Sequence, residues 1–183
     1  MTRITLAVTG SISAYKAADL TSQLTKAGYD VTILMTEAAT QFITPLALQV
    51  LSKNIVHTDV MTEPLPNKVN HIELAKQTDL FLVAPATANT IAKLAHGLAD
   101  NIVTAVALAL PSHTPRLLAP AMNTVMYENP LTQANLHSLE SVGYRFIEPR
   151  ETLLACGDYG KGALAELPLI LETVKEIIHE KTI

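Results

Sequence analysis

The stretch "RITLAVTGSISAYK", residues 3–16, indicates the fold class of this chain. Its first half, RITLAVT (3–9), is a continuous apolar and β-prone run, typical of a strand covered on both faces by helices. Gly10 permits a tight turn, and a helix is expected from Ser13 to Ala27, with apolar side chains recurring at helical spacing. A strand, a turn and a helix in this order form the first part of a βαβ unit with a parallel sheet.

The same alternation continues to the end of the chain. Further strands are expected at 30–36, 79–87, 115–122 and 144–148, and further helices at 87–96, 100–110, 130–142 and 167–180. One interruption, 61–71, is rich in turn-forming residues. The pattern predicts one α/β domain over residues 1–183, a Rossmann-like or flavodoxin-like doubly wound parallel sheet in three layers.

Composition excludes several classes of protein. Hydrophobic residues make up 49% of the 183 residues and charged residues 16%, an apolar balance that predicts contact between copies of the chain. The net charge is −4 and Lys and Arg form no cluster, so we expect no nucleic-acid partner. No apolar run approaches the roughly 20 residues that span a bilayer, so no membrane association is expected. The single cysteine suits a reducing compartment and a cytoplasmic location.

The turn after the first strand is a candidate phosphate site. It lacks the G-x-G-x-x-G pattern of dinucleotide-binding turns, but Gly10 allows a close approach of the backbone to a ligand. Ser11 and Ser13 add hydroxyls at a helix N-terminus, where N–H groups and the helix dipole attract anions. These residues fit an ordinary serine N-cap equally well, and the sequence leaves both interpretations open.

Two further strand ends carry small and hydroxyl-bearing residues. "MTEAATQF" (35–42) and "PATANTIAKLAHGLADN" (85–101) follow expected strands, at the edge where open α/β sheets bind ligands. Alanines leave room for a flat ring, while threonine and asparagine side chains supply hydrogen bonds without charge. This combination favours flavin mononucleotide (FMN) over a metal, because the histidines and carboxylates show no spacing typical of metal ligands.

Five ordered motifs make the chain resemble a known family. "GSISAYK" (10–16), "HIELA" (71–75), "PATANT" (85–90), "PAMNTVMY" (120–127) and "ACGDYGKGALAE" (155–166) occur in this order in the homo-oligomeric flavin-containing cysteine decarboxylases. The resemblance extends from Arg3 to the last helix. It is strongest with the branch that acts on 4′-phosphopantothenoylcysteine in coenzyme A biosynthesis. The chain ends at Ile183, so it resembles the monofunctional form rather than the fusion with a downstream ligase.

The resemblance implies a set of site residues and an assembly. His71 and Cys156 fall on the family's catalytic positions, and Asn123 falls on its substrate-binding asparagine. Tyr127 stands where the family commonly has tryptophan. The family's assembly is a homotrimer or a dodecamer built from trimers. The positions implied to bind FMN are Gly10, Ser11, Ile12, Thr36, Glu37, Ala38, Thr87, Ala88, Asn89, Thr90 and Ala121.

The implied chemistry assigns each of these three residues a task. FMN oxidises the substrate transiently to a thioaldehyde, loss of CO2 gives an ene-thiolate, and the reduced flavin then returns its electrons to yield 4′-phosphopantetheine. His71 suits proton removal near neutrality, and Asn123 suits binding of the carboxylate. Cys156 suits proton donation as the electrons return. Taken alone, His71 is also consistent with a helix-capping histidine and Asn123 with a turn asparagine.

The cysteine lies in a segment, 153–166, that contains three of the seven glycines. We expect a mobile lid in which Gly157, Gly160 and Gly162 act as hinges, and we expect Lys161 to be solvated rather than paired with an anionic group of the substrate. Two rival functions stay open, a peptidyl-cysteine decarboxylase that stops at the ene-thiol and a non-catalytic regulatory relative. The presence of Cys156 favours the complete reaction, and a flavin prenyltransferase of similar fold fits less well because it would have no use for this segment.

Overall fold

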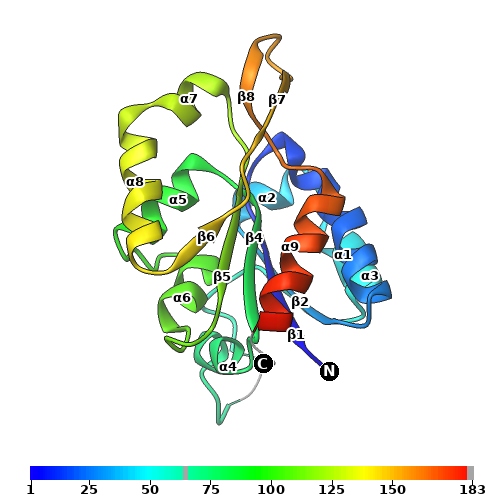
Figure 1. Ribbon diagram of the computed structural model, residues 1–183. Coiled ribbons are helices and arrows are strands. Elements are labelled where there is room, and N and C mark those ends of the chain that lie inside the picture. Colours follow the sequence, from blue (N-terminus) through cyan, green and yellow to red (C-terminus); the bar gives the residue numbers. More distant parts are fainter. Residues whose placement is uncertain (64–65, 181–183) are drawn as a thin grey trace.

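A computed structural model describes residues 1–63 and 66–180 of the chain. At its centre is a six-stranded sheet with the order β3-β2-β1-β4-β5-β6, in which all neighbouring strands are parallel (Figure 1). The strands are β1 (Arg3–Val8), β2 (Asp30–Met35), β3 (Val56–His57), β4 (Leu80–Ala86), β5 (Arg116–Pro120) and β6 (Tyr144–Phe146). Strand order reverses direction between β1 and β4, as in a doubly wound sheet.

Helices cover both faces of the sheet, which confirms the predicted three-layer fold (Figure 1). On one face pack α1 (Ala17–Lys26), α3 (Pro45–Ser52) and α9 (Leu167–Glu180), and α1 contacts both of the others. On the other pack α4 (Asn70–Lys76), α5 (Ala88–Ala95), α6 (Ile102–Ala109) and α8 (Pro130–Ser141). Within the described ranges, no helix is long and apolar enough to span a bilayer.

The central strands β1 and β4 are mainly apolar because both of their faces are buried. In β1, Ile4 and Leu6 belong to the core under α1 and α9, whereas Ala7 belongs to the core on the opposite face. Strand β4 alternates in the same way, with Leu82 on the first face and Phe81 on the second, and every one of its residues is buried. This two-sided burial explains the continuous hydrophobic run with which the chain begins.

Several elements differ from the sequence prediction. The expected helix from Ser13 to Ala27 is divided into a 3-10 turn, η1 (Ile12–Lys16), and the α-helix α1. The short elements β3, α2 (Glu37–Thr40), α3 and α7 (Thr124–Glu128) were not predicted, and α4 is the helix implied by the capping interpretation of His71, although its N-cap residue is Val69 and His71 lies within it. In the expected 61–71 interruption, α4 begins at Asn70, and residues 64–65 lie outside the described part.

The expected glycine-rich loop at 153–166 contains regular structure. Strands β7 (Arg150–Leu153) and β8 (Tyr159–Ala163) pair antiparallel and form a separate two-stranded hairpin. The hairpin projects from the end of the sheet at which α2, α5 and α7 begin (Figure 1). The prediction of a loop over this segment was therefore wrong for β8, and the parts without strand structure are the tip 154–158, which contains Cys156, and residues 164–166.

Candidate functional site

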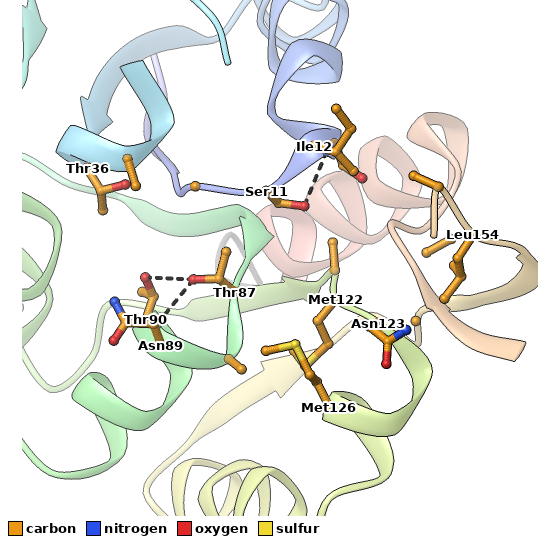
Figure 2. Close-up of a pocket in the computed structure, with 18 of the residues that line it drawn as sticks. Ser11, Ile12, Thr36, Thr87, Asn89, Thr90, Met122, Asn123, Met126 and Leu154 are labelled. Carbon is orange, nitrogen blue, oxygen red and sulfur yellow. Dashed lines mark hydrogen bonds between the residues drawn. The ribbon is translucent and has the colours of Figure 1, made fainter. Parts of the chain in front are cut away.

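A pocket of about 870 Å³ opens beyond the carboxyl ends of β1, β2, β4 and β5 (Figure 2). Its remaining wall comes from the β7–β8 hairpin. Asn123 and Cys156 line it, so the structure brings these two candidates together. Every position expected to bind FMN also lines the pocket: Gly10, Ser11, Ile12, Thr36, Glu37, Ala38, Thr87, Ala88, Asn89, Thr90 and Ala121.

Side-chain caps begin the helices that border this pocket (Figure 2). The Ser11 hydroxyl accepts a hydrogen bond from Ser13 N at 3.2 Å, which supports the N-cap interpretation of this serine. Thr36 Oγ1 accepts from Ala39 N at 3.3 Å, and Thr87 Oγ1 accepts from the N–H of the threonine three residues later, also at 3.3 Å. Several helix N-termini therefore meet at the pocket, and the partial positive charge of each favours an anion there.

The turns after β1, β2 and β4 are held close to one another. Thr9, fully buried, donates from its hydroxyl to Pro85 O at 2.7 Å and accepts from Thr87 N at 3.0 Å. Gly10 lies directly against α2, because a Cβ added at this position would be 2.5 Å from Ala38 Cβ. The turn after β1 thus requires glycine for its close contact with Ala38, and the backbone there stays flat and free of side chains.

Asn123, Cys156 and Asp158 form a cluster at the hairpin side of the pocket. Asn123 Nδ2 donates to Cys156 Sγ at 3.2 Å and to Asp158 Oδ2 at 3.1 Å. The Cys156 thiol lies 3.3 Å from the same carboxylate oxygen, to which it donates. Asn123 Oδ1 accepts from Val125 N at 2.8 Å, so this side chain also caps α7, as the turn interpretation predicted. Sequence reasoning missed Asp158, although it lies in the quoted cysteine motif.

The glycines of the hairpin are contact positions rather than the hinges that the sequence suggested. A Cβ on Gly160 would lie 2.6 Å from Thr124 Oγ1, and a Cβ on Gly162 would clash with the carbonyl oxygen of Met122. Gly162 O also accepts a hydrogen bond from Met122 N at 2.9 Å. Only Gly157, at the tip, has open space around it, and its φ of +90° explains the need for glycine.

His71 lies in α4 and does not line the pocket. Its side chain is half-buried, and its Nδ1 has no hydrogen-bond partner among the described residues. The preceding residue, Asn70, contacts His57 Nδ1 through its amide nitrogen at 3.2 Å. Burial lowers the pKa of His57 below its usual value. A single copy of the chain therefore does not bring His71 together with Asn123 and Cys156.

Charged pocket residues were also missed from the sequence. Lys16, Lys93 and Arg150 line the pocket; Lys16 and Lys93 lie in stretches singled out beforehand, but their charges were not considered. Lys93 pairs with Asp100 at 2.5 Å, and Arg150 donates to Leu164 O at 2.9 Å. Lys16 ends η1 and is the N-cap residue of α1, so its place in GSISAYK gave no local sign that it lines the pocket.

Lys161 is not simply solvated, contrary to the sequence expectation. Its ammonium group pairs with Glu148 and lies 5.5 Å from the centre of the Tyr127 ring. The hydrogen bond to Glu148 raises the pKa of Lys161 above its usual value. Burial, together with the nearby Glu148 charge, raises the pKa of Tyr127. The tyrosine that replaces the family's usual tryptophan is thus fixed beneath the hairpin by polar contacts.

Comparison with known proteins places this geometry among flavoproteins. The Flavoprotein family model matches residues 1–179. A curated relative from Streptococcus mutans, a probable phosphopantothenoylcysteine decarboxylase, is 63% identical over 174 residues, which is 95% of this chain and 97% of the relative.

Two solved structures share the fold over almost the whole length. A cysteine-to-serine variant of a PPC decarboxylase, complexed with pantothenoylaminoethenethiol, superposes with a TM-score of 0.89 at 37% identity and covers 96% of this chain and 97% of its own. The FMN binding protein AtHal3 superposes with a TM-score of 0.83 at 35% identity, with 96% of each chain covered. Both superpositions extend over 96% of this chain.

Proposed function

This chain belongs to the flavoprotein family, and from that premise we propose that it decarboxylates 4′-phosphopantothenoylcysteine to 4′-phosphopantetheine and CO2 in coenzyme A biosynthesis. The observation that carries this proposal is that the candidate catalytic, substrate-binding and FMN-binding residues, except His71, line one pocket. Asn123 and Cys156, the candidate groups for decarboxylation and proton return, lie in hydrogen-bond contact beside all the candidate FMN positions. Cys156 is the one cysteine of the chain, and the amide that donates to its thiol is that of Asn123, at 3.2 Å.

The residues present fit FMN. Gly10 leaves a side-chain-free surface against Ala38, Ser11 caps the helix beside it, and Thr87 and Asn89 supply neutral polar groups on the opposite side. The converging helix N-termini provide partial positive charge for a phosphate. When bound, FMN would accept a hydride from the substrate's cysteine β-carbon and return it after CO2 has left.

Asn123 is proposed to bind the substrate's carboxylate. Its Oδ1 is engaged by Val125 N, which leaves the Nδ2 group facing Cys156 and Asp158 at the pocket wall. An uncharged amide can orient a carboxylate without stabilising its negative charge as strongly as a cation would. This is useful where the carboxylate must lose that charge as CO2 departs.

Cys156 is proposed to donate the proton that accompanies the return of electrons. It is exposed at the hairpin tip, within reach of the amide that would orient the carboxylate. The carbon that loses CO2 and the group that re-protonates it would then lie on the same side of the pocket. A relative that lacks this thiol would stop at the ene-thiol product.

His71 is proposed to remove a proton during oxidation of the substrate, in the pocket of a second copy. Its position in α4, outside its own pocket, and its unpaired Nδ1 among the described residues support this arrangement. Exposed apolar side chains near α3, including Phe42, Leu46 and Val50, offer surface that an assembly would cover. We propose a homotrimer, alone or as the unit of a dodecamer. The single cysteine supports a cytoplasmic location.

The function is tested by purifying the protein, recording its visible spectrum and measuring CO2 release from 4′-phosphopantothenoylcysteine. We expect a flavin spectrum and stoichiometric formation of 4′-phosphopantetheine. A protein that cannot be loaded with FMN, or that releases CO2 but accumulates only the ene-thiol, would contradict the proposal. The second result would instead favour the peptidyl-cysteine type of decarboxylase.

The shared site is tested by mixing two inactive variants. His71→Asn and Asn123→Ala alter different walls of the proposed site, and each alone should lose about three orders of magnitude in activity. Co-assembled from denatured or co-expressed chains, they should recover a measurable fraction of wild-type activity, because some sites would receive both native residues. Recovery that is absent in correctly assembled mixed oligomers would place both residues in one chain's site.

A further inference from the structure

The carboxylate of Asp158 contacts Asn123 and Cys156. In the proposed reaction, the carboxylate of the substrate would bind to the same two side chains. Asp158 Oδ2 accepts a hydrogen bond from Asn123 Nδ2 at 3.1 Å and one from the Cys156 thiol at 3.3 Å. Both donors belong to the proposed machinery for decarboxylation and proton return. Asp158 thus satisfies in the protein itself the contacts that a bound carboxylate would need.

The geometry of Asn123 makes this contact specific. The Oδ1 atom accepts from Val125 N at 2.8 Å, so the orientation of the amide is determined by the start of α7. The amide nitrogen is the part of the side chain that remains for a ligand. Both of its hydrogen bonds within the described chain go to the hairpin tip, to Cys156 and to Asp158.

The hairpin tip can release Asp158 without unfolding the hairpin. The tip turn is closed by backbone hydrogen bonds between Leu154 N and Asp158 O at 2.8 Å and between Gly157 N and Leu154 O at 2.9 Å. Its attachment to the sheet domain lies further along β8, where Gly162 contacts Met122. The Asp158 side chain is exposed, so it can rotate into water while these backbone contacts persist.

We propose that Asp158 is a positioning residue that orients the Cys156 thiol, occupies the amide nitrogen of Asn123, and yields both donor groups to the carboxylate of the incoming substrate. This inference rests on the proposed function. Two carboxylates that share one amide and one thiol repel each other, so the substrate's carboxylate binds only as Asp158 rotates away. After CO2 leaves, the donors are free again and Asp158 returns to them.

If the substrate's carboxylate replaces Asp158 at Asn123 and Cys156, two ligands that differ only in a carboxylate should respond differently to mutation of Asp158. The first is 4′-phosphopantothenoylserine, in which a hydroxyl replaces the reactive thiol. The second is its decarboxylated counterpart, 4′-phosphopantothenoylethanolamine. Only the first has to displace Asp158. Affinities of both are measured by titration of the FMN-loaded protein and of three variants, Asp158→Asn, Asp158→Ser and Glu151→Gln.

Removal of the Asp158 charge should tighten the serine probe about fivefold and change the ethanolamine probe less than twofold, because one close like-charge repulsion between exposed groups is lost. Glu151→Gln removes the same charge from an exposed position on β7 and should leave both affinities unchanged. The selective tightening should diminish as salt is added. A purely structural role for Asp158 would weaken both probes together.

Weaker binding of the serine probe in both Asp158 variants, or an equal change with both probes, would overturn the inference. Failure of the proposed function is distinguishable, because the wild-type protein would then release no CO2 from 4′-phosphopantothenoylcysteine and would bind neither probe. If wild-type protein turns over the substrate but the Asp158 variants show no selective tightening, the inference alone is wrong.

Discussion

The carboxyl edge of the sheet and the β7–β8 hairpin form opposite walls of one pocket, but they are built differently. The sheet edge is supported by a core that is buried on both faces, and its turns are tied together through the buried Thr9 hydroxyl. The hairpin projects from the domain, and its tip is exposed (Figure 1). We therefore propose that FMN binding depends on the sheet edge, the rigid wall, and that proton donation to the substrate depends on the hairpin, the exposed wall. Mutations in one wall should then affect one of these two steps and leave the other unchanged.

The largest difference between the effect on product formation and the effect on FMN binding is expected from Cys156→Ser. This change removes the proposed proton donor from the exposed wall and leaves the sheet edge untouched, so product formation should fall about 1,000-fold while FMN content stays normal. A single turnover should release about one CO2 per site before the reaction stops. Quantifying CO2 and 4′-phosphopantetheine in the same rapid-mixing experiment checks this, and full product formation at the wild-type rate would refute the role of the thiol.

The attachment of the hairpin is tested next by Gly162→Ala. The new Cβ would clash with Met122 O and displace Asn123 from the hairpin tip, so kcat should fall about 100-fold while FMN affinity changes little. Gly157→Ala is the matched control, because that glycine has open space around it and only its positive φ would be strained. Equal losses in the two variants would mean that the close contact at Gly162 is unimportant.

On the rigid wall, Gly10→Ala should weaken FMN binding about tenfold. Its Cβ would lie 2.5 Å from Ala38 Cβ, so α2 must shift and the flat surface beside it is lost. Fluorescence titration of the apoprotein with FMN measures the effect. With FMN in excess, CO2 release should approach the wild-type rate, and a turnover defect that persists at saturating FMN would show that the two walls are not separable.

The smallest effect concerns pH and lies away from both walls. Burial lowers the pKa of His57, and its Nδ1 contacts the Asn70 amide, so the folded protein favours the neutral ring. A group whose pKa is lowered on folding contributes stability above its unfolded pKa, about 6.5, and that contribution is lost as the pH falls below it. Replacing His57 by Gln should therefore reduce the loss of Tm between pH 7 and pH 5 by a few degrees.

FMN content is the internal reference for this last prediction. It should be unaffected by His57→Gln at pH 7, because His57 does not line the pocket in which all the candidate FMN positions lie. Thermal unfolding measured at several pH values reports the stability difference directly. An unchanged pH dependence of Tm would mean that His57 does not contribute to acid sensitivity.

Prediction from sequence worked best where one physical requirement dominated. The runs 3–9 and 79–87 are apolar because both faces of the strand are covered, so fold class and strand positions followed directly. The resemblance, supported by the strand ends, placed the candidate FMN positions, and all of them line the pocket. The last helix, α9, agrees in both bounds with its expected range of 167–180 because its apolar side chains recur on one face.

Prediction failed where the decisive neighbour is distant in sequence. Gly160 and Gly162 suggested mobility, but their contacts with Thr124 and Met122 become visible only when β8 is placed beside α7. Asp158 was overlooked because a single carboxylate in a turn has no distinguishing local pattern. The position of His71 outside the pocket depends on how β4 and α4 are arranged, which its local motif does not contain.

Because main-chain atoms hold the hairpin in place, the side chains of its tip could be exchanged to redesign this class of enzyme. Gly162 O accepts a hydrogen bond from Met122 N, which joins the hairpin to the chain before α7, and Arg150 donates to Leu164 O, which closes the base of the hairpin, so both contacts end on main-chain oxygen atoms. Side chains between these anchor points are therefore open to exchange as a cassette, provided that the glycine contacts are kept. Libraries confined to 151–159 would vary the group presented to the substrate, while the wall proposed to hold FMN remains constant.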